Sequence, residues 1–238
     1  MQTIDSAIIL GKNQVKNNNH VVKVFTRKNG IQAMYVSQAA KKKSVKSAVL
    51  QPLSICQIEY SSSKNTTLPK LKEAKIEIPL LNIHMDVFKT AIALFTADLL
   101  IKVLPHEGET RLYDFIDNSI QILNEIEEGK SNYHLFFLVK MTKWLGIQPT
   151  LKKESCVVFD LKEGVFLAQK PNHPHYLSKE ETNIFYQLLV LEWTKIGTLL
   201  IKSVMRRKLL NSLIQYYIFH VPGFSKPKAL TILEEVFD

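Results

Sequence analysis

The chain has 238 residues, of which 46% are hydrophobic, and its formal net charge is +9. This apolar content excludes a disordered chain, and the length is enough to bury a core in one large or two small domains. No apolar run reaches the length that spans a bilayer, and residues 1–10 lack the charged-then-apolar layout of a secretory signal, so we expect a soluble, cytoplasmic protein.

The excess positive charge lies entirely in the first third of the chain. Residues 1–80 contain 13 Lys and Arg against 4 Asp and Glu, whereas the remaining 158 residues contain 18 of each sign. A local excess of one sign creates a field that attracts polyanions, which favours a nucleic-acid partner. The alternative is a solvated, lysine-rich surface with no ligand.

The first 80 residues also show strand-like patterns with short polar connections. The segments 21–26 and 31–37 form a predicted hairpin, and Asn29-Gly30 in its turn is expected to supply the positive φ angles of a tight turn. In residues 55–60, two sets of side chains alternate as on a half-buried strand. With the segments 4–10 and 68–78, these patterns predict five strands in a small antiparallel barrel of the OB type. Such barrels bind single-stranded nucleic acid with basic loops and aromatic stacking platforms.

After Pro79 the apolar residues recur at helical spacing. Ser178 to Glu181 forms a predicted capping box for one of the later helices. The fold class is therefore α+β, with an OB-type barrel domain in residues 1–80 and an all-helical domain in residues 81–238. The predicted helices are 85–104, 111–128, 133–145, the segment after Ser178, 205–220 and 226–237.

Motifs at both ends of the chain resemble those of the RecO family of recombination mediators. Near the start, Phe25-Thr26 is followed by Gly30, a basic segment and Leu50-Gln51-Pro52-Leu53. Leu53 stands where the family has phenylalanine. Near the end, an Arg-Arg helix is followed by His220-Val221-Pro222-Gly223-Phe224. The order of these motifs covers almost the whole chain.

The resemblance implies a DNA-repair accessory protein without catalysis. RecO proteins bind single- and double-stranded DNA, anneal complementary strands, and work with the ring protein RecR. They also bind the acidic C-terminal tail of single-strand-binding protein and help the recombinase to displace it. Association with the nucleoid in the cytoplasm would follow from these activities.

Annealing requires cations that neutralise two mutually repelling strands, and the basic first third could supply them. The two aromatic candidates for stacking on bases are Phe25 and Tyr35, and we expect one of them to belong to the core, because alternate strand positions are buried. The expected phosphate contacts are Lys12, Lys16, Arg27, Lys28, Lys41, Lys42, Lys43 and Lys46.

An acidic partner tail would need a cationic rim around an apolar pocket. The best candidates in the helical domain are Lys140 and Lys143 on one predicted helix and Arg206 and Arg207 on another. The alternative is that these are ordinary exposed charges.

Many RecO proteins carry a four-cysteine zinc knuckle, whereas here Cys156 stands alone in the corresponding region, residues 147–177. With His173 and His175 it falls short of the four ligands that structural zinc requires. We therefore predict a degenerate knuckle without metal, packed instead by apolar side chains. Those side chains are Val157, Phe159, Val165 and Phe166.

The sequence contains no Gly-rich phosphate loop and no nucleophile or metalloprotease motif, so we predict neither an enzyme nor a cofactor. Two alternatives to a DNA mediator remain. One is a general OB-fold protein that binds RNA or the ribosome, and the other is an adaptor whose basic hairpin serves folding or solubility.

Overall fold

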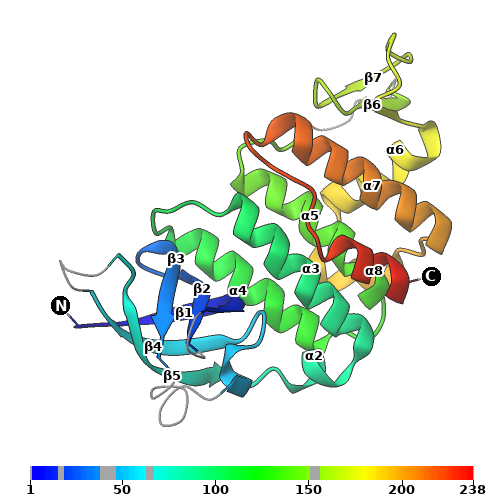
Figure 1. Cartoon of the computed structure of the whole chain (residues 1–238). Coiled ribbons are helices and arrows are strands. Elements are labelled where there is room, and N and C mark those ends of the chain that lie inside the picture. The colour runs from blue at the N-terminus through cyan, green and yellow to red at the C-terminus, as the bar shows by residue number, and fades with distance from the viewer. Residues whose placement is uncertain (1, 16–18, 38–46, 63–66, 151–155, 238) are drawn as a thin grey trace. The chain divides into compact units, whose positions relative to one another are not determined.

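The structure is a computed structural model that describes residues 2–15, 19–37, 47–62, 67–150 and 156–237. Figure 1 shows the chain, which divides into two compact units, Met1–Glu125 and Ile126–Asp238. The change from strands to helices comes earlier, between Ile78 and Leu81, so it does not coincide with the division between the two compact units. The predicted domain boundary at residue 80 stays a prediction.

Five strands open the first unit and close into a barrel in the order β1-β2-β3-β5-β4. This confirms the predicted α+β class with five N-terminal strands. The prediction of a fully antiparallel barrel needs one correction, because β3 and β5 pair in parallel through Tyr35 and Lys70. The strands are β1 (Gln2–Gln14), β2 (His20–Thr26), β3 (Gly30–Val36), β4 (Ile55–Ser61) and β5 (Lys70–Ile78).

The barrel interior is filled by alternate side chains of each strand, as the period of two requires. On β2 and β3 the inward positions are even-numbered, so the odd-numbered side chains point outward. This parity decides which side chains of the barrel can meet a ligand. The inward set consists of Ala7, Ile9, Val22, Val24, Met34, Val36, Cys56, Ile58, Tyr60, Leu71 and Ala74, with Leu50 beneath them.

The turn between β2 and β3 differs in detail from its prediction. Gly30 has a φ of 68°, whereas Asn29 is not among the residues with positive φ. The reason is that Thr26 pairs with Gly30, so the connection is a three-residue loop, 27–29, and Gly30 directly after it is the left-handed residue. A Cβ at Gly30 would also lie 2.6 Å from the carbonyl oxygen of Glu107, so the site requires glycine.

Three helices complete the first unit: α2 (Leu81–Met85), α3 (Val87–Val103) and α4 (Thr110–Glu125). Asp86 caps α3 by accepting hydrogen bonds from the amides of Phe88 and Lys89. The Lys89 side chain is fully buried, and its Nζ donates to the carbonyl oxygen of Asn124 at 2.9 Å near the C-terminal end of α4. A cation at the negative end of a helix is favourable, so Lys89 joins α3 to α4.

The second unit is mainly helical but contains a small sheet. Strands β6, β7 and β8 pair in the order β7-β6-β8, which corrects the expectation of an all-helical domain. Phe159 of β6 and Phe166 of β7 are buried and pack against each other. Ser178 and Glu181 form the predicted capping box at the start of α6. The elements are η3 (Lys130–Asn132), α5 (Tyr133–Trp144), β6 (Val158–Asp160), β7 (Val165–Leu167), β8 (Tyr176–Leu177), α6 (Lys179–Val190), η4 (Trp193–Thr198), α7 (Ser203–His220) and α8 (Leu230–Val236).

Helix α5 packs against both α6 and α7 in this unit. The buried hydroxyl of Tyr217 donates to the carbonyl oxygen of Leu138 at 2.7 Å. The hydroxyl of Tyr216 donates to the carbonyl oxygen of Ile147 at 2.5 Å. These bonds join α7 to the middle of α5 and to the segment that follows it. Within the described ranges, no helix has both the length and the apolarity needed to cross a bilayer.

Candidate nucleic-acid and peptide interfaces

The outward face of β2 and β3 carries two rows of side chains at odd-numbered positions. On β2 they are Val21, Lys23 and Phe25, and they lie opposite Tyr35, Ala33 and Ile31 on β3. Lys23 and Tyr35 are half-buried, while Phe25 is fully buried. One end of this face is therefore covered and the other is accessible.

Helix α4 covers the end that contains Phe25. The ring of Phe25 stacks on Tyr113 of α4 with 5.8 Å between ring centroids, and both residues are buried. Burial also raises the pKa of the Tyr113 hydroxyl far above its ordinary value. Phe25 therefore belongs to the packing between barrel and helix in this structure. Of the two stacking candidates, only Tyr35 is partly exposed.

Arg27 follows β2 and also contacts α4. Its guanidinium lies 2.8 Å from the Asp114 carboxylate, and each side chain is nearly half exposed, at 43% and 46%. The same guanidinium lies 5.7 Å from the centre of the Tyr113 ring. A phosphate that binds Arg27 would compete with Asp114, so this cation is less available than its charge suggests.

Lys28 lines a cleft that is bounded by the β2–β3 turn, by β3 and by residues 68–69, which precede β5. The cleft is open to solvent and has a volume of about 650 Å³. Its lining residues are Thr3, Lys28, Asn29, Gln32, Ala33, Tyr60, Ser62, Leu68 and Pro69.

Polar groups in this cleft are held in defined positions. The Asn29 amide donates to the Tyr60 hydroxyl at 2.9 Å, and the backbone amide of Lys28 donates to Asp5 at 3.1 Å. The Gln32 Oε1 atom is buried and has no hydrogen-bond partner among the described residues. A buried acceptor without a partner is costly, so a donor from a ligand would be favourable there.

The remaining predicted phosphate contacts divide into two groups. Lys12 is exposed near the end of β1, opposite Val22. The other five lie outside the described residues, so their positions stay a prediction. They are Lys16, Lys41, Lys42, Lys43 and Lys46.

Lys23 is a functional candidate that the sequence-based selection missed. That selection took cations from loops and turns, whereas Lys23 lies within β2. It shares its outward parity with Phe25, and its partner across the ladder is Ala33 on the accessible face. The signal was present in the sequence, because the alternation of Val22 and Val24 with Lys23 places the lysine outside the barrel.

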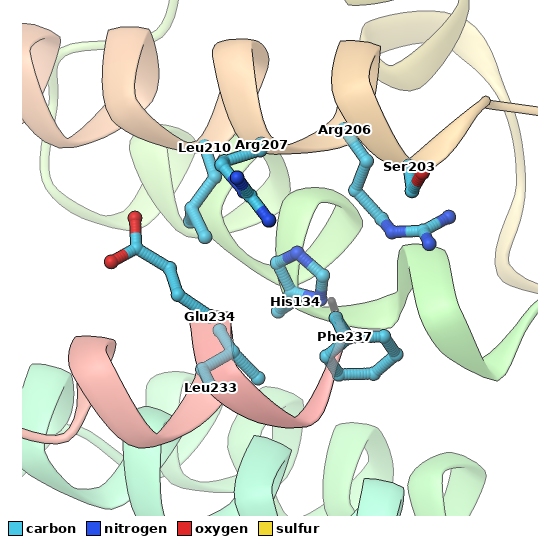
Figure 2. A pocket seen from close by; sticks show the side chains of 8 residues that line it. All are labelled: His134, Ser203, Arg206, Arg207, Leu210, Leu233, Glu234 and Phe237. Carbon is cyan, nitrogen blue, oxygen red and sulfur yellow. The ribbon is translucent and has the colours of Figure 1, made fainter.

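In the second unit, a shallow hollow lies between α7 and α8, with α5 behind it. Figure 2 shows Arg206 and Arg207 extending from α7, Leu233 and Phe237 from the α8 segment, and His134 between them. The structure thus brings two of the four predicted tail-binding cations together at one hollow. The complete lining is His134, Ser203, Arg206, Arg207, Leu210, Leu233, Glu234 and Phe237.

Arg206 is firmly held at this hollow. Its Nη1 donates to the carbonyl oxygen of Ile201 at 3.0 Å, and it also lies within hydrogen-bond distance of Ser131 and Asn132. Burial lowers the pKa of its guanidinium. Arg207, by contrast, is exposed. The first arginine is therefore a fixed part of the wall, and the second lies at the rim.

The other two cations of the predicted tail site have different surroundings. The Lys140 Nζ donates to the carbonyl oxygen of Leu189 at 2.8 Å and lies 4.8 Å from the centre of the Phe136 ring. Burial lowers its pKa. This lysine joins α5 to the end of α6. Lys143 is exposed near the end of α5.

The knuckle region does not fit a zinc site. The Cys156 thiol is buried and donates to the Phe166 carbonyl oxygen at 3.4 Å. His173 lies 3.2 Å from Asp160, and the His175 ring packs edge-on against Phe219. The two histidines also contact each other, because the backbone amide of His175 donates to His173 Nδ1 at 3.3 Å, whereas the thiol of Cys156 donates elsewhere. Among the residues that the structure describes, no three His, Cys, Asp or Glu side chains are arranged to hold a metal ion.

Aromatic packing occupies the centre of this region instead. The Phe159 ring lies 4.8 Å from Phe166 and 4.7 Å from Phe185 of α6, and all three side chains are buried. Val157 and Val165 are half-buried at its edge. Such a core can hold a loop that a metal holds elsewhere. The absence of bound zinc in solution stays a prediction.

The fold defines a class of protein, in which a closed OB-type barrel with outward cations precedes a helical unit. Comparison with known sequences then gives the family. Residues 1–79 match the family model described as Recombination protein O N terminal, and residues 84–229 match Recombination protein O C terminal. The chain therefore belongs to the RecO family of DNA repair proteins, as the motifs at its two ends predicted.

Individual relatives agree with the family models over the full length. The chain is 34% identical to the proteins named DNA repair protein RecO from Flavobacterium psychrophilum and Flavobacterium johnsoniae, and these alignments cover 100% of each chain. It is 30% identical to the protein of the same name from Phocaeicola vulgatus, over 97% of each chain. The similarity thus includes both the barrel and the helical unit.

Proposed function

We propose that this protein is a non-catalytic recombination mediator that binds single- and double-stranded DNA through its barrel and promotes strand annealing. With RecR, it helps to load the recombinase onto DNA that is coated with single-strand-binding protein. Its place of action is the cytoplasm, in association with the nucleoid.

The observation that carries this proposal is a closed five-stranded barrel in the part of the chain that contains all the excess charge. Two DNA strands repel each other, and cations that replace condensed counterions lower this repulsion. A barrel with basic side chains on strands and loops can approach both strands. Family membership over both parts of the chain supports the same role.

The accessible end of the β2–β3 face supports a path for single-stranded DNA. Tyr35 offers a ring on which a base can stack, and Lys23 offers a cation on the same face. Lys28 lines the neighbouring cleft and offers a second cation. Phosphate contacts would set the position of the strand, and stacking would add affinity without sequence preference.

The hollow of Arg206 and Arg207 supports the second part of the proposal, recognition of an acidic partner tail. It combines a cationic rim with apolar walls from Leu210 and Leu233. A carboxylate-rich peptide with an apolar residue matches this combination. The acidic tail of single-strand-binding protein is the expected ligand.

The test of the mediator role is annealing of complementary DNA strands that are coated with single-strand-binding protein. We expect the purified protein to accelerate annealing, and to lose affinity for DNA steeply as salt rises. Binding to RNA alone would instead favour the general RNA-binding or ribosome-associated alternative. Absence of any salt-dependent nucleic-acid binding would favour an adaptor.

A matched pair of variants tests where the DNA binds. Changing Lys41, Lys42, Lys43 and Lys46 together to alanine is expected to weaken binding of single-stranded DNA strongly. The control changes four exposed lysines of the second unit to alanine and removes the same charge. Equal losses in both variants would show that net charge, rather than the barrel, determines binding. The control residues are Lys162, Lys170, Lys179 and Lys195.

A further inference from the structure

The hollow between α7 and α8 is already nearly full. Its free volume is about 20 Å³, room for about one water-sized sphere. The side chain of Phe237, which follows α8, forms part of its wall. In Figure 2 this ring lies below His134 and beside Arg206.

Phe237 makes the contacts that an incoming aromatic residue would make. Its ring centre lies 5.5 Å from the Arg206 guanidinium carbon and 5.5 Å from the centre of the His134 ring. A guanidinium near the face of an aromatic ring is attracted by the ring quadrupole. His134 is 1% exposed, and burial lowers its pKa to about 3, so its ring is neutral at physiological pH and accepts apolar packing.

The residues before Phe237 have the composition of an acidic tail. The segment 234–237 reads Glu-Glu-Val-Phe, two carboxylates followed by two apolar residues. Glu234 lines the same hollow as Arg207, and its Oε1 accepts a hydrogen bond from Asn211 of α7 at 3.4 Å. The segment therefore combines the negative charge and the apolar group that the hollow is suited to bind.

Helix α8 is anchored so that Phe237 can leave without unfolding the unit. Leu230 and Leu233 are 2% and 1% exposed, whereas Val236 and Phe237 are only half-buried. The anchor thus lies in the first part of the helix. The last turn of α8 and Phe237 can swing away while Leu230 and Leu233 hold the first part of the helix in place.

We infer that the segment 234–237 is an internal pseudo-ligand, which occupies the hollow between α7 and α8 and is displaced by an acidic peptide that carries an aromatic residue. This inference rests on the acidic-tail part of the proposed function and adds its regulation. The partner can bind only when Phe237 is displaced. Its apparent dissociation constant is therefore the intrinsic one divided by the fraction of molecules in which the hollow is open.

The test measures binding of a short fluorescent peptide that is rich in aspartate and ends in phenylalanine. If Phe237 occupies the hollow nine-tenths of the time, Phe237→Ala should tighten binding about tenfold, and a chain that ends at Val236 should behave alike. Ile232→Ala is the matched control, because Ile232 is 42% exposed on the same helix and outside the hollow. It should leave the affinity unchanged. Thermal unfolding checks that each variant is folded.

A second readout follows Phe237 itself. With 4-fluorophenylalanine at position 237, the fluorine resonance should move toward its solvent-exposed value as the peptide is added. A peptide that binds wild type and Phe237→Ala equally, or binds the variant more weakly, would overturn the inference and leave the tail site intact. Absence of peptide binding to every variant would instead refute the tail site, and the inference with it, while DNA binding by the barrel is measured separately.

Discussion

The barrel and the second unit use their basic side chains in different ways. On the barrel, Lys12 and Lys28 are exposed, and Lys23 lies on the outward face. In the second unit, Lys140 and Arg206 are half-buried, donate to backbone carbonyl oxygens, and have pKa values that burial lowers. A count of positive residues does not separate these cases. The difference lies in burial: the half-buried cations of the second unit hold the fold, whereas Lys12 and Lys28 keep exposed side chains.

The same contrast exists between two aromatic residues on one face of the barrel. Phe25 and Tyr35 both point outward from neighbouring strands. Helix α4 covers the first through Tyr113, and the second stays partly exposed. The outward side of a strand is thus a second core where a helix lies on it, and an accessible surface at Tyr35.

The largest expected effect separates these two rings. Phe25→Ala removes a fully buried ring and should lower the free energy of unfolding by about 3–5 kcal/mol. Tyr35→Ala should change stability far less and should weaken single-stranded DNA binding by about 1–3 kcal/mol if a base stacks there. Urea unfolding and fluorescence anisotropy measure the two quantities. A large stability loss in Tyr35→Ala with unchanged DNA affinity would remove the contrast.

A second pair of changes tests the contrast between adjacent arginines. Arg206→Ala removes charge-assisted hydrogen bonds to Ile201, Ser131 and Asn132, so we expect a loss of about 1.5–3 kcal/mol of stability. Arg207→Ala changes an exposed side chain and should stay within about 0.5 kcal/mol of wild type. Both are measured by urea unfolding. Equal effects would show that Arg206 is not the structural member of the pair.

The pH dependence of stability tests the buried imidazole behind the hollow. Burial lowers the pKa of His134 from 6.5 to about 3, so the unfolded chain binds this proton more readily than the folded one. The stabilisation is complete above pH 6.5 and is lost as pH falls toward 3. Between pH 7 and pH 5, the free energy of unfolding should fall by about 2 kcal/mol through this group.

The variant His134→Phe removes this titration, and groups common to both proteins cancel in the comparison. We expect the variant to lose less stability than wild type when urea unfolding is repeated at pH 5. If both proteins lose the same amount, His134 is not neutral in the folded state. His134→Leu provides a second apolar replacement in case the larger ring disturbs the packing.

Much of the barrel could be predicted from local pattern, because Cys56, Ile58 and Tyr60 alternate with polar residues and do fill the interior. The fate of Phe25 could not, since it depends on a helix that begins more than 80 residues later. Arg206 is similar: its partners Ser131 and Asn132 precede it by about 75 residues. Lys23, by contrast, could have been found from the sequence, because its odd-numbered position on β2 places its side chain outside the barrel.

The most direct test of the account is the salt dependence of single-stranded DNA binding by the variant Lys12→Ala, Lys23→Ala, Lys28→Ala. Each lost phosphate contact should reduce the slope of log affinity against log salt by about 0.7, so the triple variant should lose about 2 in slope. The control changes Lys162, Lys179 and Lys195 of the second unit to alanine and should keep the wild-type slope. An unchanged slope in the barrel variant, or an equal decrease in the control, would contradict a DNA site on the barrel.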